Sequence, residues 1–303
     1  MTNETSAAAA NTPVGLSVTE QLQHATMRIE VANDKGEITS TGTGFIFLFF
    51  NHNGHSVPAV VTNKHVLEGA KKIGLRFTLQ NKSGGPDYKN HFNLVIENFE
   101  KAWLPHPDPN VDLAVIPIGH HLQDMRKLNK LPFFTSIDQK IIPTPANLKS
   151  LLPLEDVLVV GYPDGIFDSA NNLPIFRRGI TATPAYIDFE GAKRFLIDAS
   201  IFPGSSGSPV FLYNAGSYAN KDGSLAIGSR LMLLGVVYAV ATHATTGDIR
   251  FVPAPTQTRQ VAVSAIPNNL GVCVQSGQLL AFEQVLVDKV GFKSPDEYLQ
   301  RKE

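Results

Sequence analysis

Apolar residues along the chain gather in short runs of strand length, and turn-forming residues separate one run from the next. In the first half these runs are Arg28–Val31, Thr43–Phe50, Ala59–Thr62, Ile73–Leu79, Phe92–Ile96 and Leu113–Pro117. Short apolar runs at this spacing predict the strands of an antiparallel barrel. The glycine- and proline-containing segment Asn81–Asp87 predicts the turn of a hairpin between two of them.

A second series of apolar runs follows residues 136–153, which contain three prolines and little periodicity and therefore predict an inter-domain linker. The polar segments Tyr213–Ser229 and His243–Pro255 predict long loops among these runs. We expect a second set of strands at Val157–Val160, Arg178–Ala182, Ala185–Phe189, Arg194–Asp198, Ser208–Leu212, Leu231–Val240 and Gly271–Gln275.

The pattern changes towards both ends of the chain. Val18–Ile29 has apolar residues spaced for a short helix, and Leu279–Val290 has the spacing of an amphipathic closing helix. The predicted organisation is all-β, with a disordered leader at 1–15, an N-terminal barrel at 16–135, a linker at 136–153, a C-terminal barrel at 154–276, and a helix and tail at 277–303.

Composition narrows the classes of function. The formal net charge of the 303 residues is −1, so we expect neither nucleic acid nor an anionic membrane as a partner. No apolar stretch approaches the ~20 residues that a membrane helix requires. Cys273 is the single cysteine, which excludes an internal disulfide. The single cysteine, together with the lack of a recognisable export signal, leads us to expect a reducing, cytoplasmic location.

The segment Gly204–Phe211, GSSGSPVF, places serines in a glycine-flanked turn just before an apolar strand. Glycines on both sides let the backbone approach closely and direct N–H groups toward one point. These features favour an activated serine nucleophile with its own oxyanion hole. By residue type alone, Ser205, Ser206 and Ser208 are equal candidates.

Two upstream segments supply partners for such a serine. His65 follows the apolar run Ala59–Thr62, and Asp112 directly precedes another apolar run. A neutral imidazole accepts the proton of a serine hydroxyl, and a buried carboxylate orients that imidazole. Asp108 is the rival carboxylate, but it lies in a His-Pro-Asp-Pro turn, where its side chain is expected to bond its own loop.

The chain has nine histidines, of which His52 and His55 are close enough in sequence to suggest a metal site. No third ligand of suitable spacing follows these two residues. We therefore expect no metal and no organic cofactor.

With histidine, aspartate and serine in this order, the chain resembles the chymotrypsin-like (trypsin-fold) serine peptidases, in particular their disulfide-free bacterial intracellular branch. The resemblance covers roughly Thr26 to Leu280 and implies two antiparallel six-stranded barrels and hydrolysis of peptide bonds through an acyl-enzyme. It is carried by GTGFIF at Gly42–Phe47, TNKHV around His65, VDLAVIPI around Asp112, VVGYP at Val159–Pro163, GSSGSPVF around Ser206, and LLGVVYA at Leu233–Ala239.

The resemblance implies catalytic roles for His65, Asp112 and Ser206. In the family pattern, glycine stands two residues before the nucleophile and one residue after it, and only Ser206 satisfies both. The backbone N–H groups of Gly204 and Ser206 are then expected to form the oxyanion hole. Ser205 stands where members activated by cleavage usually carry aspartate, so activation by a newly made N-terminus is not expected.

The same motif positions imply a primary substrate pocket. Ser200 is expected near its floor, Tyr238 and Val240 along one wall, and Gly271 near another. No carboxylate matches the floor, so we expect a small, aliphatic or other uncharged side chain before the scissile bond. Asp198 could still reach the pocket, and an acidic preference stays open.

Two functions are compatible with the sequence. One is a serine endopeptidase that acts on protein or peptide substrates, with a regulatory protein partner left open. The other is a catalytically silent binding or scaffold module of the same fold. The intact set of His65, Asp112 and Ser206 favours the peptidase, because a degraded site usually carries a substitution at one of these positions.

Overall fold

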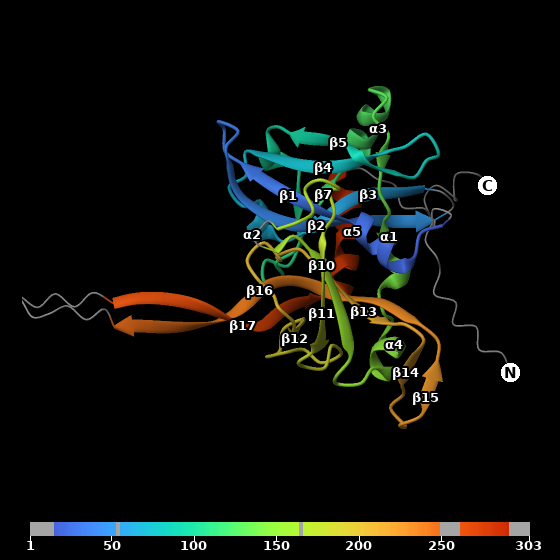
Figure 1. The fold of residues 1–303 in the computed structure, drawn as a ribbon, viewed down its shortest axis with the longest axis vertical. Helices are drawn as coiled ribbons and strands as arrows, with labels where there is room; N and C mark the ends of the chain where they lie inside the picture. The colour runs from blue at the N-terminus through green and yellow to red at the C-terminus, as the bar shows by residue number, and fades with distance from the viewer. Residues whose placement is uncertain (1–14, 53–54, 164–165, 249–260, 291–303) are drawn as a thin grey trace, which may run out of the picture.

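The structure is a computed structural model that describes residues 15–52, 55–163, 166–248 and 261–290. The predicted leader lies outside these residues except for Gly15. The fold is mostly β, and its strands form two bodies stacked one above the other, the N-terminal half above the C-terminal half in Figure 1. None of the helices in the described ranges is both long enough and apolar enough to span a bilayer.

The N-terminal half is a nine-stranded sheet in the order β5-β4-β1-β2-β3-β7-β6, with β8 paired to β4 and β9 paired to β2. Its strands are β1 (Thr26–Ala32), β2 (Ile38–His52), β3 (His55–Thr62), β4 (Lys72–Gln80), β5 (Pro86–Ile96), β6 (Leu104–Pro105), β7 (Ala114–Pro117), β8 (Pro132–Phe133) and β9 (Ile137–Asp138).

The hydrogen-bonded path of this sheet stays open between β5 and β6 over the described residues, so the N-terminal half differs in detail from the expected six-stranded barrel. The edge strand β6 has only two residues, and its Pro105 has no N–H to donate to a further strand. At the other edge, β5 is partly exposed along most of its length.

The C-terminal half is a closed six-stranded barrel in the order β10-β11-β12-β17-β16-β13, as predicted. A separate two-stranded hairpin, β14 and β15, projects from it. The strands are β10 (Asp156–Gly161), β11 (Ile175–Thr181), β12 (Arg194–Asp198), β13 (Pro209–Asn214), β14 (Ser217–Ala219), β15 (Leu225–Ile227), β16 (Arg230–Asp248) and β17 (Val261–Gln275).

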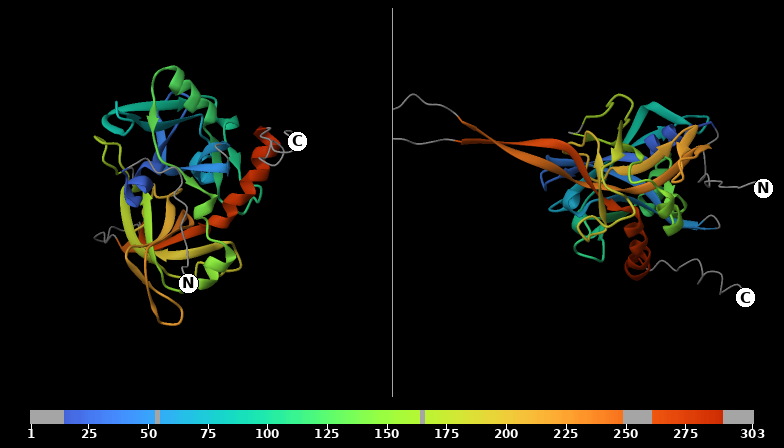
Figure 2. Two further views of the ribbon diagram at one scale, coloured as in Figure 1. Left: turned by 90° about the vertical axis from the view of Figure 1, so that its right-hand side faces the viewer. Right: turned by 90° about the horizontal axis from the view of Figure 1, so that it is seen from below.

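Helices occupy the ends and connections of the two halves. The closing helix α5 packs along the seam between them (Figure 2). The helical elements are α1 (Val18–Ala25), α2 (Lys64–Leu67), η1 (Phe99–Lys101), α3 (Gly119–Lys127), η2 (Gln139–Ile141), α4 (Pro145–Ser150), η4 (Ser276–Leu280) and α5 (Ala281–Val290).

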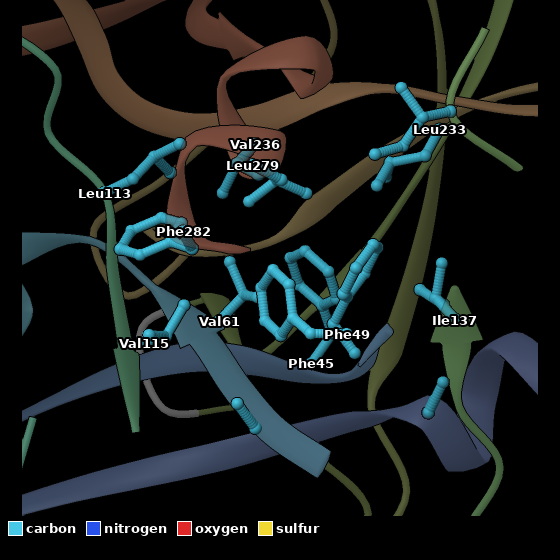
Figure 3. Close-up of a cluster of buried hydrophobic side chains, with 14 of the residues drawn as sticks. Phe45, Phe49, Val61, Leu113, Val115, Ile137, Leu233, Val236, Leu279 and Phe282 are labelled. Atoms are coloured by element: carbon cyan, nitrogen blue, oxygen red, sulfur yellow. The ribbon is translucent and has the colours of Figure 1, made fainter. Parts of the chain in front are cut away.

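Most strands near the seam are buried on both faces, which explains why they read as continuous apolar runs. In β2, Phe45, Phe47 and Phe49 point into the seam between the halves, whereas Ile46 points into the core of the N-terminal sheet. Neighbouring side chains of the barrel strands likewise point to two different cores, because successive residues of a strand face opposite sides. Figure 3 shows Phe282 of α5 among the seam residues.

The structure corrects several expected boundaries. The helix at Val18 ends at Ala25, and the chain continues directly as β1. Residues 136–153, which we expect to link the two halves, contain the short elements β9, η2 and α4. Ala185–Phe189 is not a strand: it forms a turn in which Ile187 donates to the carbonyl of Pro184. Proline before the segment favours that turn.

The two predicted loops also contain regular structure. Tyr213–Ser229 includes the hairpin of β14 and β15. Much of His243–Pro255 belongs to a two-stranded ribbon, because β16 continues to Asp248 and pairs with β17 as far as Val261. The ribbon extends well beyond the barrel in Figure 1. The rest of that predicted loop lies outside the described residues.

Candidate active site

His65 and Asp112 are in direct contact at one end of the N-terminal sheet. His65 belongs to α2, which begins just after β3 ends at Thr62, and Asp112 lies just before β7. Because Thr62 pairs with Ala114, the end of β3 lies beside the start of β7. The Nδ1 atom of His65 is 2.5 Å from Oδ2 of Asp112. The backbone N–H of His65 donates to Oδ1 of the same carboxylate over 3.2 Å.

The surroundings of Asp112 favour its charged form. Partial burial opposes the charge, but the side-chain hydrogen bond from His65, the charge of that ring, and the backbone N–H groups of His65 and Lys64 outweigh it. The pKa of Asp112 is therefore lowered. Asn63 donates to the backbone carbonyl of Asp112 over 2.6 Å and fixes the loop. The imidazole is held through Nδ1, while 44% of the His65 side chain stays exposed.

Ser206 lies in a tight turn between β12 and β13 that requires glycine at two positions. Gly204 and Gly207 have φ angles of 83° and 87°, in the left-handed region that other residues rarely adopt. A side-chain carbon at Gly207 would also lie 1.9 Å from the carbonyl oxygen of Thr43. The glycines therefore set both the shape of the turn and its close approach to β2.

The N–H groups of this turn divide into bonded and unbonded ones. In the described part of the chain, the N–H groups of Gly204 and Ser206 have no acceptor. They are the two amides that the sequence analysis expects to form an oxyanion hole. The other three donate to carbonyl oxygens at 2.8–3.0 Å: Ser205 to Phe202, Gly207 to Val237 and Ser208 to Ser205.

Strand β2 connects the serine turn to the histidine segment. The N–H of Thr43 donates to the carbonyl of Ser206 over 2.9 Å. The preceding residue, Gly42, packs against Val66, which directly follows His65. Ser206 and the histidine segment thus flank consecutive residues of one strand. The side chains of His65 and Ser206 do not hydrogen bond to each other in this structure, so the direct contact joins only two of the three predicted residues.

The environments of the rival residues differ from those of the leading candidates. Ser205 and Ser208 are buried, whereas Ser206 is partly accessible. The Ser208 hydroxyl has no hydrogen-bond partner, and the Ser205 hydroxyl accepts from the N–H of Phe202 over 3.4 Å. Asp108 is exposed, and its carboxylate accepts from the N–H of Asn110 within its own loop. Accessibility singles out Ser206 among the three serines.

Thr43 is a residue of the site to which sequence reasoning assigned no role. Its hydroxyl donates to the carbonyl of Gly204 and accepts from the N–H of Tyr162, each over 3.0 Å. Thr62 in turn donates to the carbonyl of Thr43 over 2.7 Å. This chain of bonds joins β3, β2 and the serine turn. The motifs GTGFIF and TNKHV contain both threonines and were the available signal.

The residues expected around the primary pocket lie in separate environments. Tyr238 faces a cavity of about 370 Å³ beside the Asp108–Val111 loop, and its hydroxyl accepts from Arg194 over 3.2 Å. Gly271 instead faces the buried side chains of Ile197 and Ile201. Ser200 and Asp198 are exposed. For Val240, the structure describes the backbone pairing with Gly271 and not the side chain.

The described residues do not favour metal-dependent or cysteine-based hydrolysis. No group of three or more histidine, cysteine, aspartate or glutamate side chains there could hold a metal ion; the side chains of His52 and His55 lie outside that set. The thiol of Cys273 is fully buried inside the barrel, and burial raises its pKa. A thiol that resists ionisation is a poor nucleophile.

Comparison with known proteins adds family evidence. The model of the trypsin-like peptidase domain matches residues 42–217, and no curated protein matches the chain. Three solved structures are similar over most of their length. The serine protease AL20 from an extremophilic microorganism has 13% identity and a TM-score of 0.45, and 87% of this chain covers 97% of that one.

The active form of the Rv3671c protease of M. tuberculosis has 15% identity and a TM-score of 0.40, and 91% of this chain covers 85% of that one. HL collagenase has 14% identity and a TM-score of 0.44, and 89% of this chain covers 94% of that one. The family match spans more than half of the chain and includes the segments of His65, Asp112 and Ser206. The chain therefore belongs to the family of proteins with a trypsin-like peptidase domain and is a serine-type peptidase.

Proposed function

We propose that the protein is an endopeptidase that cleaves protein substrates through Ser206, His65 and Asp112. The observation that carries this proposal is the contact of His65 with Asp112 beside a serine turn whose Gly204 and Ser206 amides lack acceptors. A base held in one orientation and two free N–H donors are the parts that acyl transfer requires.

The reaction proceeds in two steps, formation of an acyl-enzyme and its hydrolysis. The Ser206 oxygen attacks the peptide carbonyl carbon while its proton passes to Nε2 of His65, and the negative oxygen of the intermediate accepts from the Gly204 and Ser206 amides. The C–N bond then breaks, and His65 returns the proton to the leaving amine. In the second step a water molecule gives a proton to His65 and attacks the ester carbon; the ester C–O bond then breaks, and His65 returns the proton to the Ser206 oxygen, which releases the carboxyl product and restores the free serine.

The bond between Nε2 of His65 and the Ser206 hydroxyl belongs to the substrate complex in this proposal. Catalytic hydrogen bonds are often long or poorly aligned without substrate and tighten once it is bound. The lowered pKa of Asp112 supports its role, because a charged carboxylate stabilises the imidazolium that forms in the first step.

The substrate chain is held in an extended conformation along β16. Strand β13 covers one edge of β16 only as far as Val236, and the serine turn bonds to Val237. Beyond Val237, no strand of the described ranges pairs with that edge. An extended peptide can add to such an edge through main-chain hydrogen bonds. This requirement favours unfolded segments or loops as substrates.

A small, aliphatic or other uncharged side chain is proposed before the scissile bond. The surroundings of Gly271 are apolar, because Ile197 and Ile201 fill the space that a side chain there would occupy. A buried apolar site rejects an unpaired charge. Asp198 lies on the exposed side of β12 and is not assigned a role.

The test is digestion of an unfolded protein such as casein. Wild-type protein should cleave it, and mass spectrometry of the products should show uncharged residues before the new N-termini. The Ser206→Ala and His65→Ala variants should produce no fragments. Cleavage that persists in Ser206→Ala would contradict the proposed nucleophile. Absence of cleavage by folded wild-type protein would favour the silent binding module.

A further inference from the structure

Arg177 has an unusual position in the C-terminal barrel. It lies in β11 directly opposite Val159 of β10, whose side chain belongs to the barrel core. Its two neighbours lie on the other face of the strand: Phe176 packs towards the seam, and Arg178 is 75% exposed. The side chain of Arg177 therefore lies on the face of β11 that is turned towards the barrel core, where an arginine is uncommon, and it is partly buried there.

The guanidinium group of Arg177 has no counter-charge among the described residues. Its Nε atom is buried and has no hydrogen-bond partner, and no described carboxylate forms an ion pair with it. The contact that Arg177 does make is with an aromatic ring: its guanidinium carbon lies 4.9 Å from the ring centroid of Phe202. Cation–π contacts strengthen when the cation is partly removed from water.

Phe202 begins the turn that carries the proposed oxyanion hole. Its carbonyl accepts from the N–H of Ser205 over 3.0 Å, and its own N–H donates to the Ser205 hydroxyl over 3.4 Å. Ser205 in turn accepts from the N–H of Ser208. Any movement of Phe202 is therefore passed through Ser205 to the amides of Gly204 and Ser206.

We propose that Arg177 is a positioning residue that holds the serine turn in its active form by stacking on Phe202. The proposal rests on the proposed function, because it needs the Gly204 and Ser206 amides to act as an oxyanion hole. Arg177 touches neither substrate nor reacting atoms. It keeps the turn formed before substrate arrives, so no cleavage of the chain is needed to order it.

The test compares inactivation by a fluorophosphonate probe in wild type, Arg177→Gln and Phe202→Leu. Loss of the stacking contact should lower the maximal rate of Ser206 modification roughly 5- to 30-fold. The concentration of probe that gives half-maximal rate should change less than twofold, since the turn acts on the transition state. Phe202→Tyr keeps an aromatic face and should retain the wild-type rate.

Arg178→Gln is the matched control, because Arg178 is the next residue of β11 and pairs with Asp156 at the surface. It should behave as wild type. The Arg177→Gln/Phe202→Leu double variant should be no slower than the slower single variant, because both remove one contact. If the rate losses of the two single variants instead multiply in the double variant, the proposal is overturned. So would an Arg177→Gln protein that unfolds at a lower temperature but reacts at the wild-type rate.

These results also separate the two proposals. Modification of Ser206 in wild type together with normal Arg177→Gln kinetics would remove only the role of Arg177. No modification of folded wild-type protein at Ser206 would remove the proposed function itself.

Discussion

His65 and Asp112 are 47 residues apart in sequence and meet because two strands pair. Both residues follow from motif reasoning, as each stands next to an apolar run. The role of Thr43 could not be derived in that way, because its hydroxyl reaches Gly204 across 161 residues. Side-chain contacts over such separations depend on how the two halves pack, which local pattern does not encode.

Asp112→Asn tests the orienting carboxylate. The amide keeps the size of the side chain but can present its N–H₂ group to His65 and cannot stabilise the imidazolium. We expect kcat to fall by roughly 10⁴, and we expect the variant to lose, at neutral pH, the stability that the charge of Asp112 contributes. The rate of casein cleavage and the thermal midpoint measure the two effects.

Asp108→Asn is the control for this change, since Asp108 is exposed and its carboxylate accepts from the N–H of Asn110 in its own loop. It should keep the wild-type rate. The pKa of Asp112 is lowered in the folded protein, so the stability that its charge contributes is present above the unfolded pKa and is lost as pH falls through the folded value. A fully active Asp112→Asn variant would refute the assignment.

Gly207→Ala tests the shape of the serine turn. Its φ of 87° disfavours alanine, and the new methyl group would lie 1.9 Å from the Thr43 carbonyl oxygen. The turn must move, so we expect at least a ~100-fold loss of kcat, the scale of removing one oxyanion donor. Gly84 has a φ of 81° but nothing within 4 Å, so Gly84→Ala isolates the backbone strain.

Gly84→Ala should cost about 1–2 kcal/mol in stability and leave activity unchanged. Urea unfolding and casein cleavage of both variants give the comparison. Equal losses of activity in the two variants would show that close contact with β2 is not what Gly207 provides.

Elements were predictable where apolar residues supply a buried face, as in β12, in which Phe195 and Ile197 are buried and whose bounds match the expected Arg194–Asp198. They were less predictable where pairing continues beyond the core. The β16 part of the ribbon, Thr242–Asp248, is mostly polar in sequence, and it forms a strand by pairing with β17 as far as Val261. In the opposite sense, Ala185–Phe189 has strand-like residues but only an isolated bridge between Phe189 and Ala192.

A buried ion pair also joins several segments of the C-terminal half. Glu155 lies 2.7 Å from Arg230 at the start of β16, and it accepts from the N–H of Leu152 after α4. Arg230 donates to Asn214 of β13 over 2.9 Å and stacks over Tyr218 of β14. The pair fixes where the linker segment and the β14–β15 hairpin attach.

Glu155→Gln should destabilise the protein by about 3 kcal/mol, because it leaves the largely buried cation of Arg230 without its counter-charge. Asp156→Asn is the matched control: it removes the neighbouring, exposed pair with Arg178 and should cost no more than ~1 kcal/mol. Free energies of unfolding from urea titrations provide the measurement. Similar costs for the two variants would show that burial of the Glu155 pair is unimportant.

At the scale of the whole molecule, the two halves share one apolar core at the seam. Phe45 and Phe49 from β2, Leu233 and Val236 from β16, and Phe282 from α5 all belong to it (Figure 3). The proposed site lies at the same junction, since the serine turn comes from the C-terminal half and His65 from the N-terminal half. The two series of apolar runs and the family resemblance predicted two halves, but packing defines how they join.

His24 links stability to pH for the molecule as a whole. It is buried against Phe133 and lies 3.3 Å from the Tyr88 hydroxyl, and burial lowers its pKa to about 4. Above pH ~6.5 the ring is neutral in both states. As pH falls from there towards 4, the unfolded chain binds the proton first, so stability decreases by up to ~3 kcal/mol.

His24→Phe removes this titration while keeping an aromatic ring beside Phe133. Between pH 7.5 and pH 4.5 the variant should lose less stability than wild type does, as measured by urea unfolding at each pH. Parallel pH profiles for the two proteins would contradict the buried neutral state of His24.

Mapping the adduct of a fluorophosphonate probe by mass spectrometry is the most direct test of the proposed nucleophile. The reaction joins the serine oxygen to phosphorus and releases fluoride, so it marks the one hydroxyl that the site activates. We expect the adduct on Ser206, its absence from Ser206→Ala, and its retention in Ser208→Ala, whose hydroxyl is buried and unbonded. An adduct on another serine, or none on folded wild-type protein, would show that the imidazole and the serine turn do not work together.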